Sequence, residues 1–249
     1  MPPTVYMFID ERIEHRSSHS RWLIACVVVS QVQWDAVHIH AQAVGSVRKK
    51  RRLITIVDTL EKARGFAVLT YADISSDLTP PNEIDGTTDI PRMSRRDNLW
   101  SRCALSTVTA ALACLRGASP SVTAAEIDLF YDPKTLTAEH QRAIEQVVRE
   151  TLPEMAKEHP DTQESDPTVQ LLFQRMEAIP KRSGSSKANN LQTGTNLAHH
   201  LCCQAEHLLQ GNPSHRIVVR NHTSVIHDMI SKFTVEEPTV VEGAKGSTT

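Results

Sequence analysis

A short apolar run that ends in two acids opens the pattern of hydrophobic and polar positions. Residues 5–9 read VYMFI, and Asp10 and Glu11 follow directly. In a β-strand, period two places Asp10 on the face of Tyr6 and Phe8, and Glu11 on the opposite face. An acid at the end of a buried strand needs a cationic partner, for which a metal ion is suited. The competing interpretation is that Asp10 starts a solvated turn.

Further apolar runs of strand length are bounded by turn residues. They predict strands at 21–30, 65–75, 124–133 and 169–179, with a short candidate at 216–220. The run at 21–30 is rich in β-branched residues and follows a polar turn. We therefore expect it to pair with the first strand as an antiparallel hairpin.

Helical spacing of apolar residues alternates with these strands. It predicts helices at 32–65, interrupted at Gly45, and at 98–117, 138–158 behind a Thr137 cap, 190–209 and 222–233. Alternating strands and helices after a hairpin predict an α/β fold in which helices flank a mixed sheet. We expect one domain over residues 1–232 and a mobile C-terminal tail over 233–249.

The composition sets limits on the class of protein. The chain has 249 residues, 40% of them hydrophobic, and carries 27 Lys and Arg against 29 Asp and Glu. Such a balance does not point to a nucleic-acid binder as a whole, so any such binding must come from a local patch. The longest apolar run, Trp22 to Val29, is too short to span a bilayer, and five cysteines lack C-x-x-C spacing. We expect a cytoplasmic protein without membrane contact.

A second group of acids lies on the strand predicted at 124–133. Period two puts Glu126, Asp128 and Asp132 on one face. Three acids on one face repel one another unless a cation intervenes, and with Asp10 they would offer oxygen ligands for Mg²⁺ or Mn²⁺. An edge strand with a solvated polar face is the alternative, and spacing alone does not show whether the two strands are neighbours.

Basic segments are the clearest electrostatic feature. Arg48, Lys49, Lys50, Arg51 and Arg52 form an unbroken run that would attract phosphate groups in a salt-sensitive way. Further cations lie at Arg92, Arg95 and Arg96 and in the linker 182–187. Such runs are commonly solvated surface. Aromatic residues make up only 4% of the chain, so stacking on single-stranded bases is not expected.

Histidines and cysteines near the end of the helix predicted at 190–209 suggest a different chemistry. His199, Cys203 and His207 recur at i, i+4 and i+8 and share a helix face. Zinc binds such ligands, but His199 and His207 are about 12 Å apart by helix rise and cannot both reach one ion easily. A partner such as His222 or His227 would be needed, and ordinary packing is the simpler interpretation.

Several short motifs together resemble a known family. They are FIDER, with Arg12 in place of a small residue, WLIACVVVSQVQW, GFAVLTYAD, the long helix after Asn98, EIDLFYD and NNLQTGTNLAHHL. This layout, over most of residues 4 to 205, resembles the RNase H-like proteins catalogued as domain of unknown function 3800. The resemblance implies an RNase H-like mixed five-stranded sheet flanked by helices.

The same resemblance implies a two-metal nuclease site that uses Mg²⁺ or Mn²⁺. Asp10 would be the central bridging carboxylate and Asp128 or Asp132 a second ligand, with Glu11 and Asn196 as further candidate ligands. Paired metals in such sites hold the attacking water and the leaving oxygen of a phosphodiester. The candidate catalytic residues are therefore Asp10, Asp128 and Asp132.

The late helix departs from this family pattern. Where the family carries an acid three residues after Gln192, this chain has Thr195, followed by Asn196. A neutral residue there weakens a second metal site. Either Glu206 or Asp97 supplies the missing acid, or catalysis is lost. The sequence thus leaves two hypotheses: a metal-dependent nuclease of RNA or DNA, and an inactive RNase H-like module that binds nucleic acid or a protein partner.

Overall fold

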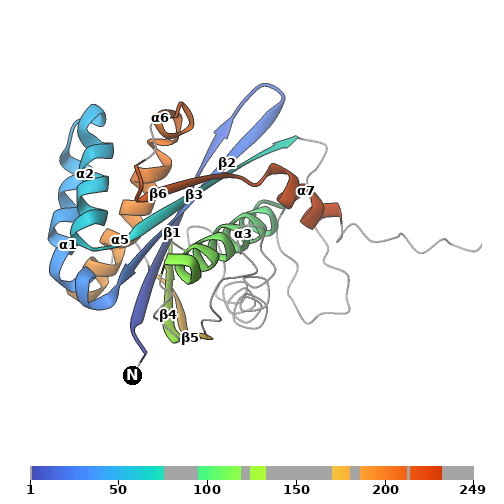
Figure 1. Cartoon of the computed structure of the whole chain (residues 1–249). Helices are drawn as coiled ribbons and strands as arrows, with labels where there is room; N and C mark the ends of the chain where they lie inside the picture. Colours follow the sequence, from blue (N-terminus) through green and yellow to red (C-terminus); the bar gives the residue numbers. More distant parts are fainter. Residues whose placement is uncertain are drawn as a thin grey trace, which may run out of the picture.

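A twisted β-sheet with helices on both faces forms the centre of the molecule (Figure 1). The computed structural model describes residues 2–75, 95–118, 124–132, 170–179, 186–211 and 214–231. The strands are β1 (Thr4–His15), β2 (His19–Ser30), β3 (Phe66–Ser75), β4 (Ala124–Tyr131), β5 (Gln170–Ala178) and β6 (Ile217–Asn221). The helices are α1 (Gln31–Ser46), α2 (Lys49–Lys62), α3 (Arg95–Ala118), α5 (Ser186–Cys202), α6 (Ala205–Leu209) and α7 (Thr223–Ser231).

The sheet mixes antiparallel and parallel pairs in the order β5-β4-β1-β2-β3-β6. The long hairpin β1–β2 pairs antiparallel from Val5 opposite Ser30 to His15 opposite Ser20, as expected from the sequence. β3 continues the antiparallel part, whereas β4, β5 and β6 join parallel to their neighbours. The expected α/β architecture is confirmed, and it is consistent with an RNase H-like fold. Counting the short edge strand β6, the described sheet has six strands.

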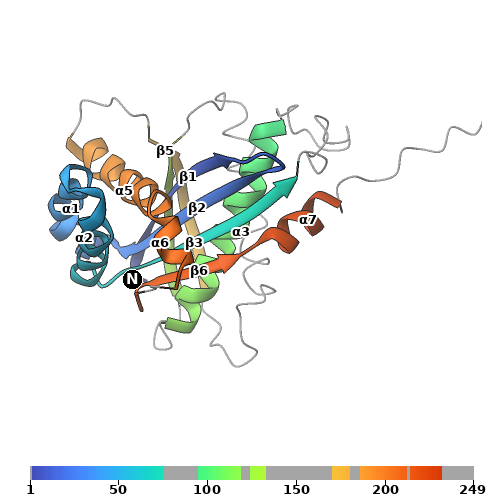
Figure 2. The ribbon, with the colours of Figure 1, turned by 90° about the horizontal axis from the view of Figure 1, so that it is seen from above.

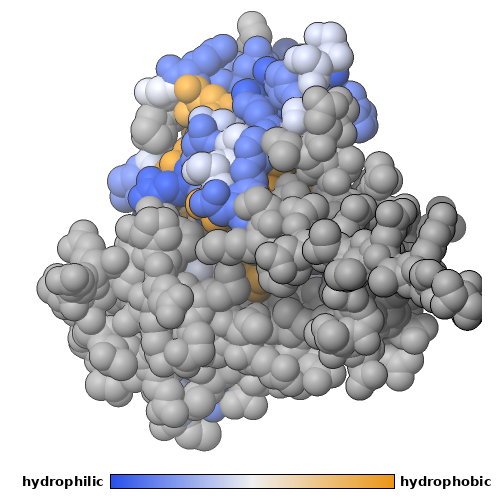
Figure 3. Space-filling model, turned by 90° about the vertical axis from the view of Figure 1, so that its right-hand side faces the viewer, coloured by the Kyte–Doolittle hydropathy of each residue, from blue (hydrophilic) through white to orange (hydrophobic). Residues whose placement is uncertain are grey.

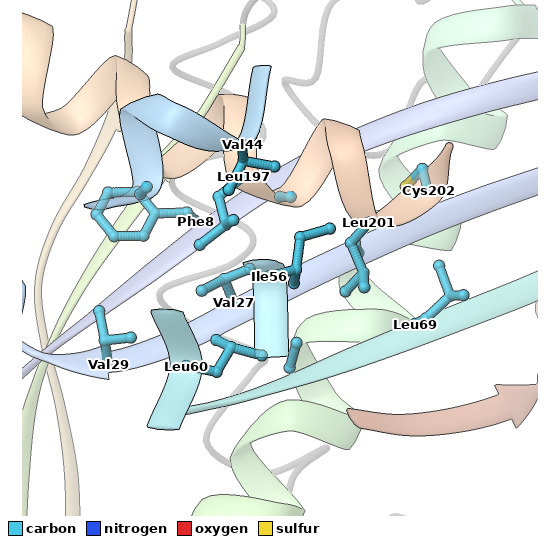
Figure 4. Close-up of a cluster of buried hydrophobic side chains, with 14 of the residues drawn as sticks. Phe8, Val27, Val29, Val44, Ile56, Leu60, Leu69, Leu197, Leu201 and Cys202 are labelled. Atoms are coloured by element: carbon cyan, nitrogen blue, oxygen red, sulfur yellow. The ribbon is translucent and has the colours of Figure 1, made fainter. Parts of the chain in front are cut away.

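Each face of the sheet packs against its own helices, so the protein has two hydrophobic cores. On one face, α3 covers residues such as Met7, Ile9 and Ile24. On the other face, α1, α2 and α5 cover Phe8 and Leu69 among others. Figure 2 shows the two groups of helices on opposite sides of the strands, and Figure 4 shows the second core, where side chains from the sheet and the three helices point toward one another.

Two of the predicted helices are each divided into two in the structure. The helical segment 32–65 is divided at Val47 and Arg48, two residues beyond the predicted break at Gly45, because the backbone there is extended. The segment 190–209 is divided at Cys203 and Gln204, which form a turn between α5 and α6. The predicted helix at 138–158 and the predicted tail at 233–249 lie outside the described residues.

The surface of the described part is mainly polar on the side shown in Figure 3. None of the described helices is long and apolar enough to cross a membrane. The exposed large hydrophobic side chains include Val32 and Ile39 on α1 and Ile54 on α2.

Candidate functional site

The parallel register of β1 and β4 brings two of the predicted acids together. Tyr6 lies opposite Asp128, and Ile9 lies opposite Tyr131. The residues that follow Ile9 on β1 and Tyr131 on β4 are Asp10 and Asp132, so these two acids come next in the same register. These three acids are buried, with exposed fractions of 4% for Asp10 and 7% for each of the others. Alternation places them on the face of Tyr6, which packs in the core under α5. The sequence alone does not show whether these two strands are neighbours, and the structure shows that they pair directly.

Glu11 lies on the opposite face, as period two predicts. Its Oε2 accepts a hydrogen bond from Trp100 Nε1 of α3 at 2.9 Å, and the carboxylate is buried. This contact ties β1 to α3. Glu11 therefore lies across the sheet from the side on which Asp10 meets α5.

Asp10 meets a histidine of α5. Its Oδ1 accepts a hydrogen bond from the backbone N–H of Glu11 at 2.7 Å, and its Oδ2 lies 3.4 Å from Nδ1 of His199. The backbone oxygen of Asp10 accepts from Sγ of Cys202 at 3.5 Å. The side chain that faces the buried carboxylate is thus an imidazole, in the helix where the family resemblance implies an acid.

His199 is held in its charged form by two partners. The carboxylate of Asp10 has the largest effect and the Cys203 side chain the next largest. Together they raise the pKa of His199 from 6.5 to about 10, although partial burial acts in the opposite direction. The imidazole side chain is 42% exposed. At neutral pH this residue is an imidazolium that supplies positive charge beside Asp10.

Cys203 lies on the other edge of the same ring. Its Sγ is 3.6 Å from Nε2 of His199. Hydrogen bonding to His199, and then to His200, lowers the pKa of the Cys203 thiol to about 5 from 9.0, although partial burial acts in the opposite direction; Arg12 adds a smaller favourable charge effect. Asp10, His199 and Cys203 therefore form a line of three groups, carboxylate to imidazole to thiol.

A glycine allows α5 to approach β1 closely enough for this contact. A Cβ atom on Gly194 would lie 2.3 Å from the ring of Phe8. Phe8 is two residues before Asp10 on the same strand face, and His199 follows Gly194 by five residues along the helix. His199, near the end of α5, and Cys203, in the turn that follows, then lie four residues apart on one side. Close packing at Gly194 thus positions the histidine over the acid.

The other candidate ligands on and after α5 do not contact Asp10 in the described structure. The Oγ1 of Thr195 donates to the backbone oxygen of Gln192 at 3.0 Å and is buried. Asn196 and Glu206 are exposed, and the side chain of Asp97 lies outside the described part. The late helix therefore brings His199, and not Thr195 or Asn196, into contact with Asp10.

The predicted zinc ligands do not converge. His207 is exposed on α6, beyond the turn that ends α5, and His222 lies with its Nδ1 2.6 Å from Oγ of Ser106. Asp10 and Cys203 contact opposite ring nitrogens of His199, so the three cannot chelate one ion together. Among the described residues, no group of three or more His, Cys, Asp and Glu side chains is arranged to hold a metal ion.

A divalent metal fits poorly at Asp10 as the site stands. The proton on Nδ1 of His199 points to Asp10, so that nitrogen has no free lone pair for a metal, and the imidazolium repels a cation. Asp10 and Asp132 would suit Mg²⁺ or Mn²⁺ by ligand type. The His199 imidazolium, however, already provides beside Asp10 the positive charge that a metal ion would bring.

The basic run lies at the start of α2, just after the end of α1. Arg48, Lys49 and Arg51 are exposed, whereas Arg52 is half-buried and donates to the backbone oxygen of Val47 at 3.3 Å. The side chain of Lys50 lies outside the described part. Gly45, three residues before the run, packs against α5, where an added Cβ would lie 3.3 Å from Nε2 of His200. The end of α1 that precedes the run therefore lies beside the end of α5 that carries His199 and His200.

No family model matches this chain, and no curated protein shows significant similarity to it.

The spacing of His199 and Cys203 is visible in the sequence, but their pairing with Asp10 is not. The i, i+4 spacing gives the helix face, whereas the contact with β1 depends on how α5 docks on the sheet. The sequence feature that indicates this contact is Gly194, five residues before His199, because such a small residue allows a close approach of the helix.

Proposed function

We propose that the protein is an RNase H-like module that binds nucleic acid and has no need of a catalytic metal. One observation carries this proposal: His199 lies 3.4 Å from the buried carboxylate of Asp10 and is held protonated there. The acid that an RNase H-like nuclease would give to a metal is therefore already neutralised by a side chain.

The charge of the neighbouring surface supports binding to phosphates. The exposed cations Arg48, Lys49 and Arg51 lie at the first turn of α2, where the positive end of the helix dipole adds to the same field. Cations that contact phosphates release counterions, so such binding weakens steeply with salt and is independent of sequence. A nucleic-acid backbone is the partner that this surface fits best.

The second candidate is a metal-dependent nuclease that cleaves phosphodiesters of RNA or DNA. Its support is the side-by-side placement of Asp10 and Asp132 by the β1–β4 register. It requires Mg²⁺ or Mn²⁺ to displace His199 from Asp10. It differs from the first candidate in a measurable way, because only a nuclease would turn over a substrate.

The binding experiment measures fluorescence anisotropy of labelled single-stranded, double-stranded and RNA–DNA hybrid oligonucleotides over a series of salt concentrations, without divalent metal. We expect binding that weakens with salt, and a triple variant Arg48→Gln, Lys49→Gln, Arg51→Gln that lowers the logarithmic salt slope by about 1 for each lost phosphate contact. The matched control neutralises three exposed cations elsewhere, Arg16, Lys62 and Arg64. Equal effects of the two triple variants, or no binding at low salt, would refute the proposal.

The cleavage experiment uses the same oligonucleotides with Mg²⁺ and with Mn²⁺, and compares the native chain with Asp10→Asn and Asp132→Asn. If the protein is a binding module without a catalytic metal, the oligonucleotides should remain intact with all three proteins. Cleavage by the native chain that both variants lose would establish the nuclease in its place.

A further inference from the structure

We infer that Cys203, His199 and Asp10 form a nucleophilic thiol site, in which Cys203 accepts acyl groups from activated esters. This inference goes beyond nucleic-acid binding and does not depend on it. It rests on the line of contacts described above, with 3.6 Å from Sγ of Cys203 to Nε2 of His199 and 3.4 Å from Nδ1 of His199 to Oδ2 of Asp10.

Geometry assigns each group a role. A thiol nucleophile needs a base within hydrogen-bond reach, and the base needs a third group that fixes its orientation. Nε2 of His199 faces the sulfur, and Nδ1 faces a carboxylate that is buried to 4% exposure and held by a backbone N–H. Cys203 is the nucleophile, His199 the acid and base, and Asp10 a positioning residue.

The thiol end of this line of groups is partly exposed to solvent. Cys203 and His200 are partly exposed, and the His199 side chain is 42% exposed, whereas Asp10 is buried behind them. The adjacent Cys202 provides the contrast. It is buried, its Sγ donates to the backbone oxygens of Asp10 and Leu23, and burial raises the pKa of its thiol. One of two consecutive cysteines is therefore an inert core thiol and the other an accessible one.

Groups from two elements act on Cys203: α5 contributes His199 and His200, and β1 contributes Arg12. The next helix, α6, carries Glu206 and His207, both exposed. The two histidines and Arg12 lower the pKa of the Cys203 thiol to about 5, the two histidines having the larger effects. The electrostatic surroundings thus agree with the geometry, since a thiolate is the nucleophilic form of cysteine.

The proposed reaction is a two-step acyl transfer. The thiolate of Cys203 attacks the carbonyl carbon of the ester, a C–S bond forms, and the C–O bond to the leaving group breaks while His199 gives its proton to the leaving oxygen. Water then attacks the thioester carbonyl, and His199 takes a proton from that water. The C–S bond breaks, the thiolate returns, and a carboxylic acid is released. The sum is one ester and one water converted to one acid and one alcohol.

The first arm of the test measures alkylation of Cys203 by iodoacetamide as a function of pH, with peptide mapping by mass spectrometry. The midpoint of the native profile should lie near 5, the pKa of the thiol. The pH profile is the proper readout, because a low pKa raises the thiolate fraction but lowers the intrinsic nucleophilicity of the thiolate. These two effects on the alkylation rate nearly cancel at neutral pH. Cys114, which is partly buried, is mapped in the same samples as an internal comparison.

Variants separate the roles of the histidine and the acid. In His199→Gln the Cys203 midpoint should rise by about 3 pH units toward that of an ordinary thiol. In Asp10→Asn it should rise by a smaller amount, because the imidazolium is less stabilised. Circular dichroism verifies that each variant is folded. If His199→Gln does not fold, the native midpoint alone decides.

The second arm measures release of p-nitrophenolate from p-nitrophenyl acetate by the native chain and by Cys203→Ser. We expect a burst of about one equivalent, as for an acyl-enzyme that forms faster than it hydrolyses, with the acetyl group mapped to Cys203. A native alkylation midpoint near that of Cys114 or of free thiols would overturn the inference. So would a burst that Cys203→Ser retains, or no burst at all.

Discussion

At the scale of single residues, His199 sets the charge at the end of α5. It lies between Asp10 and Cys203, and its protonated ring gives one N–H to each. Because both partners are anionic, they hold the ring charged over the neutral range. His199 and Cys203 therefore titrate as a coupled unit, and their effects on stability must be considered together.

The coupled unit predicts the pH dependence of stability. The pKa of His199 is raised from 6.5 to about 10, so its contribution is complete below 6.5 and is lost as pH rises to 10. The pKa of Cys203 is lowered from 9.0 to about 5, so its contribution is complete above 9 and is lost as pH falls to 5. Stability should rise from pH 5 to 6.5 and change little from 6.5 to 9.

This dependence is measured as the free energy of unfolding in urea across pH 5 to 9 for the native chain and Cys203→Ser. Other titrating groups cancel in the difference between the two proteins. The native advantage should grow as pH rises from 5. A difference that stays constant across this range would contradict the thiolate–imidazolium pair.

Gly194 gives a second prediction at the residue scale. An alanine there would put its Cβ 2.3 Å from the Phe8 ring in a packed core, so Gly194→Ala should lower the free energy of unfolding by about 1 to 3 kcal/mol. It should also shift the Cys203 alkylation midpoint upward, because α5 carries His199 away from Asp10. The matched control is Gly45→Ala, where the nearest side chain is that of His200 at 3.3 Å, and the effect should stay within about 1 kcal/mol. Equal effects of the two changes would contradict this account of helix docking.

At the scale of elements, β1 joins the two helical layers through consecutive acids. Asp10 contacts α5 on one face, and Glu11 accepts from Trp100 of α3 on the other. The alternation of a strand makes this possible with two adjacent residues. The Asp-Glu pair at the end of the apolar run is thus explained by two contacts with helices on opposite sides.

Glu11→Ala tests this role of the second acid. It leaves the indole N–H of Trp100 without its buried acceptor and should cost about 1 to 3 kcal/mol of unfolding free energy. Glu11→Gln keeps an acceptor and should cost less. The control is Glu14→Ala, at a partly exposed position of the same strand. Urea denaturation gives the values, and a Glu11→Ala variant as stable as Glu14→Ala would refute the anchoring role.

At the scale of the whole molecule, the sequence predicted the class of fold better than the site. Apolar runs and helical spacing identify β1, β2 and α3 because each pattern is local. The adjacency of β1 and β4 and the docking of α5 depend on contacts between distant segments, which no local pattern carries. The spacing of His199 and Cys203 was visible, yet their connection to Asp10 arises only when the helix is placed on the sheet.

The most direct test of the central claim is the protonation state of His199, measured by NMR of its ring nitrogens as pH is varied, with and without Mg²⁺. We predict a ring that carries protons on both nitrogens through neutral pH, titrates near 10, and does not respond to Mg²⁺. Asp10→Asn should lower that midpoint. A ring that is neutral at pH 7, or that Mg²⁺ displaces from Asp10, would contradict the claim and favour the metal-dependent nuclease.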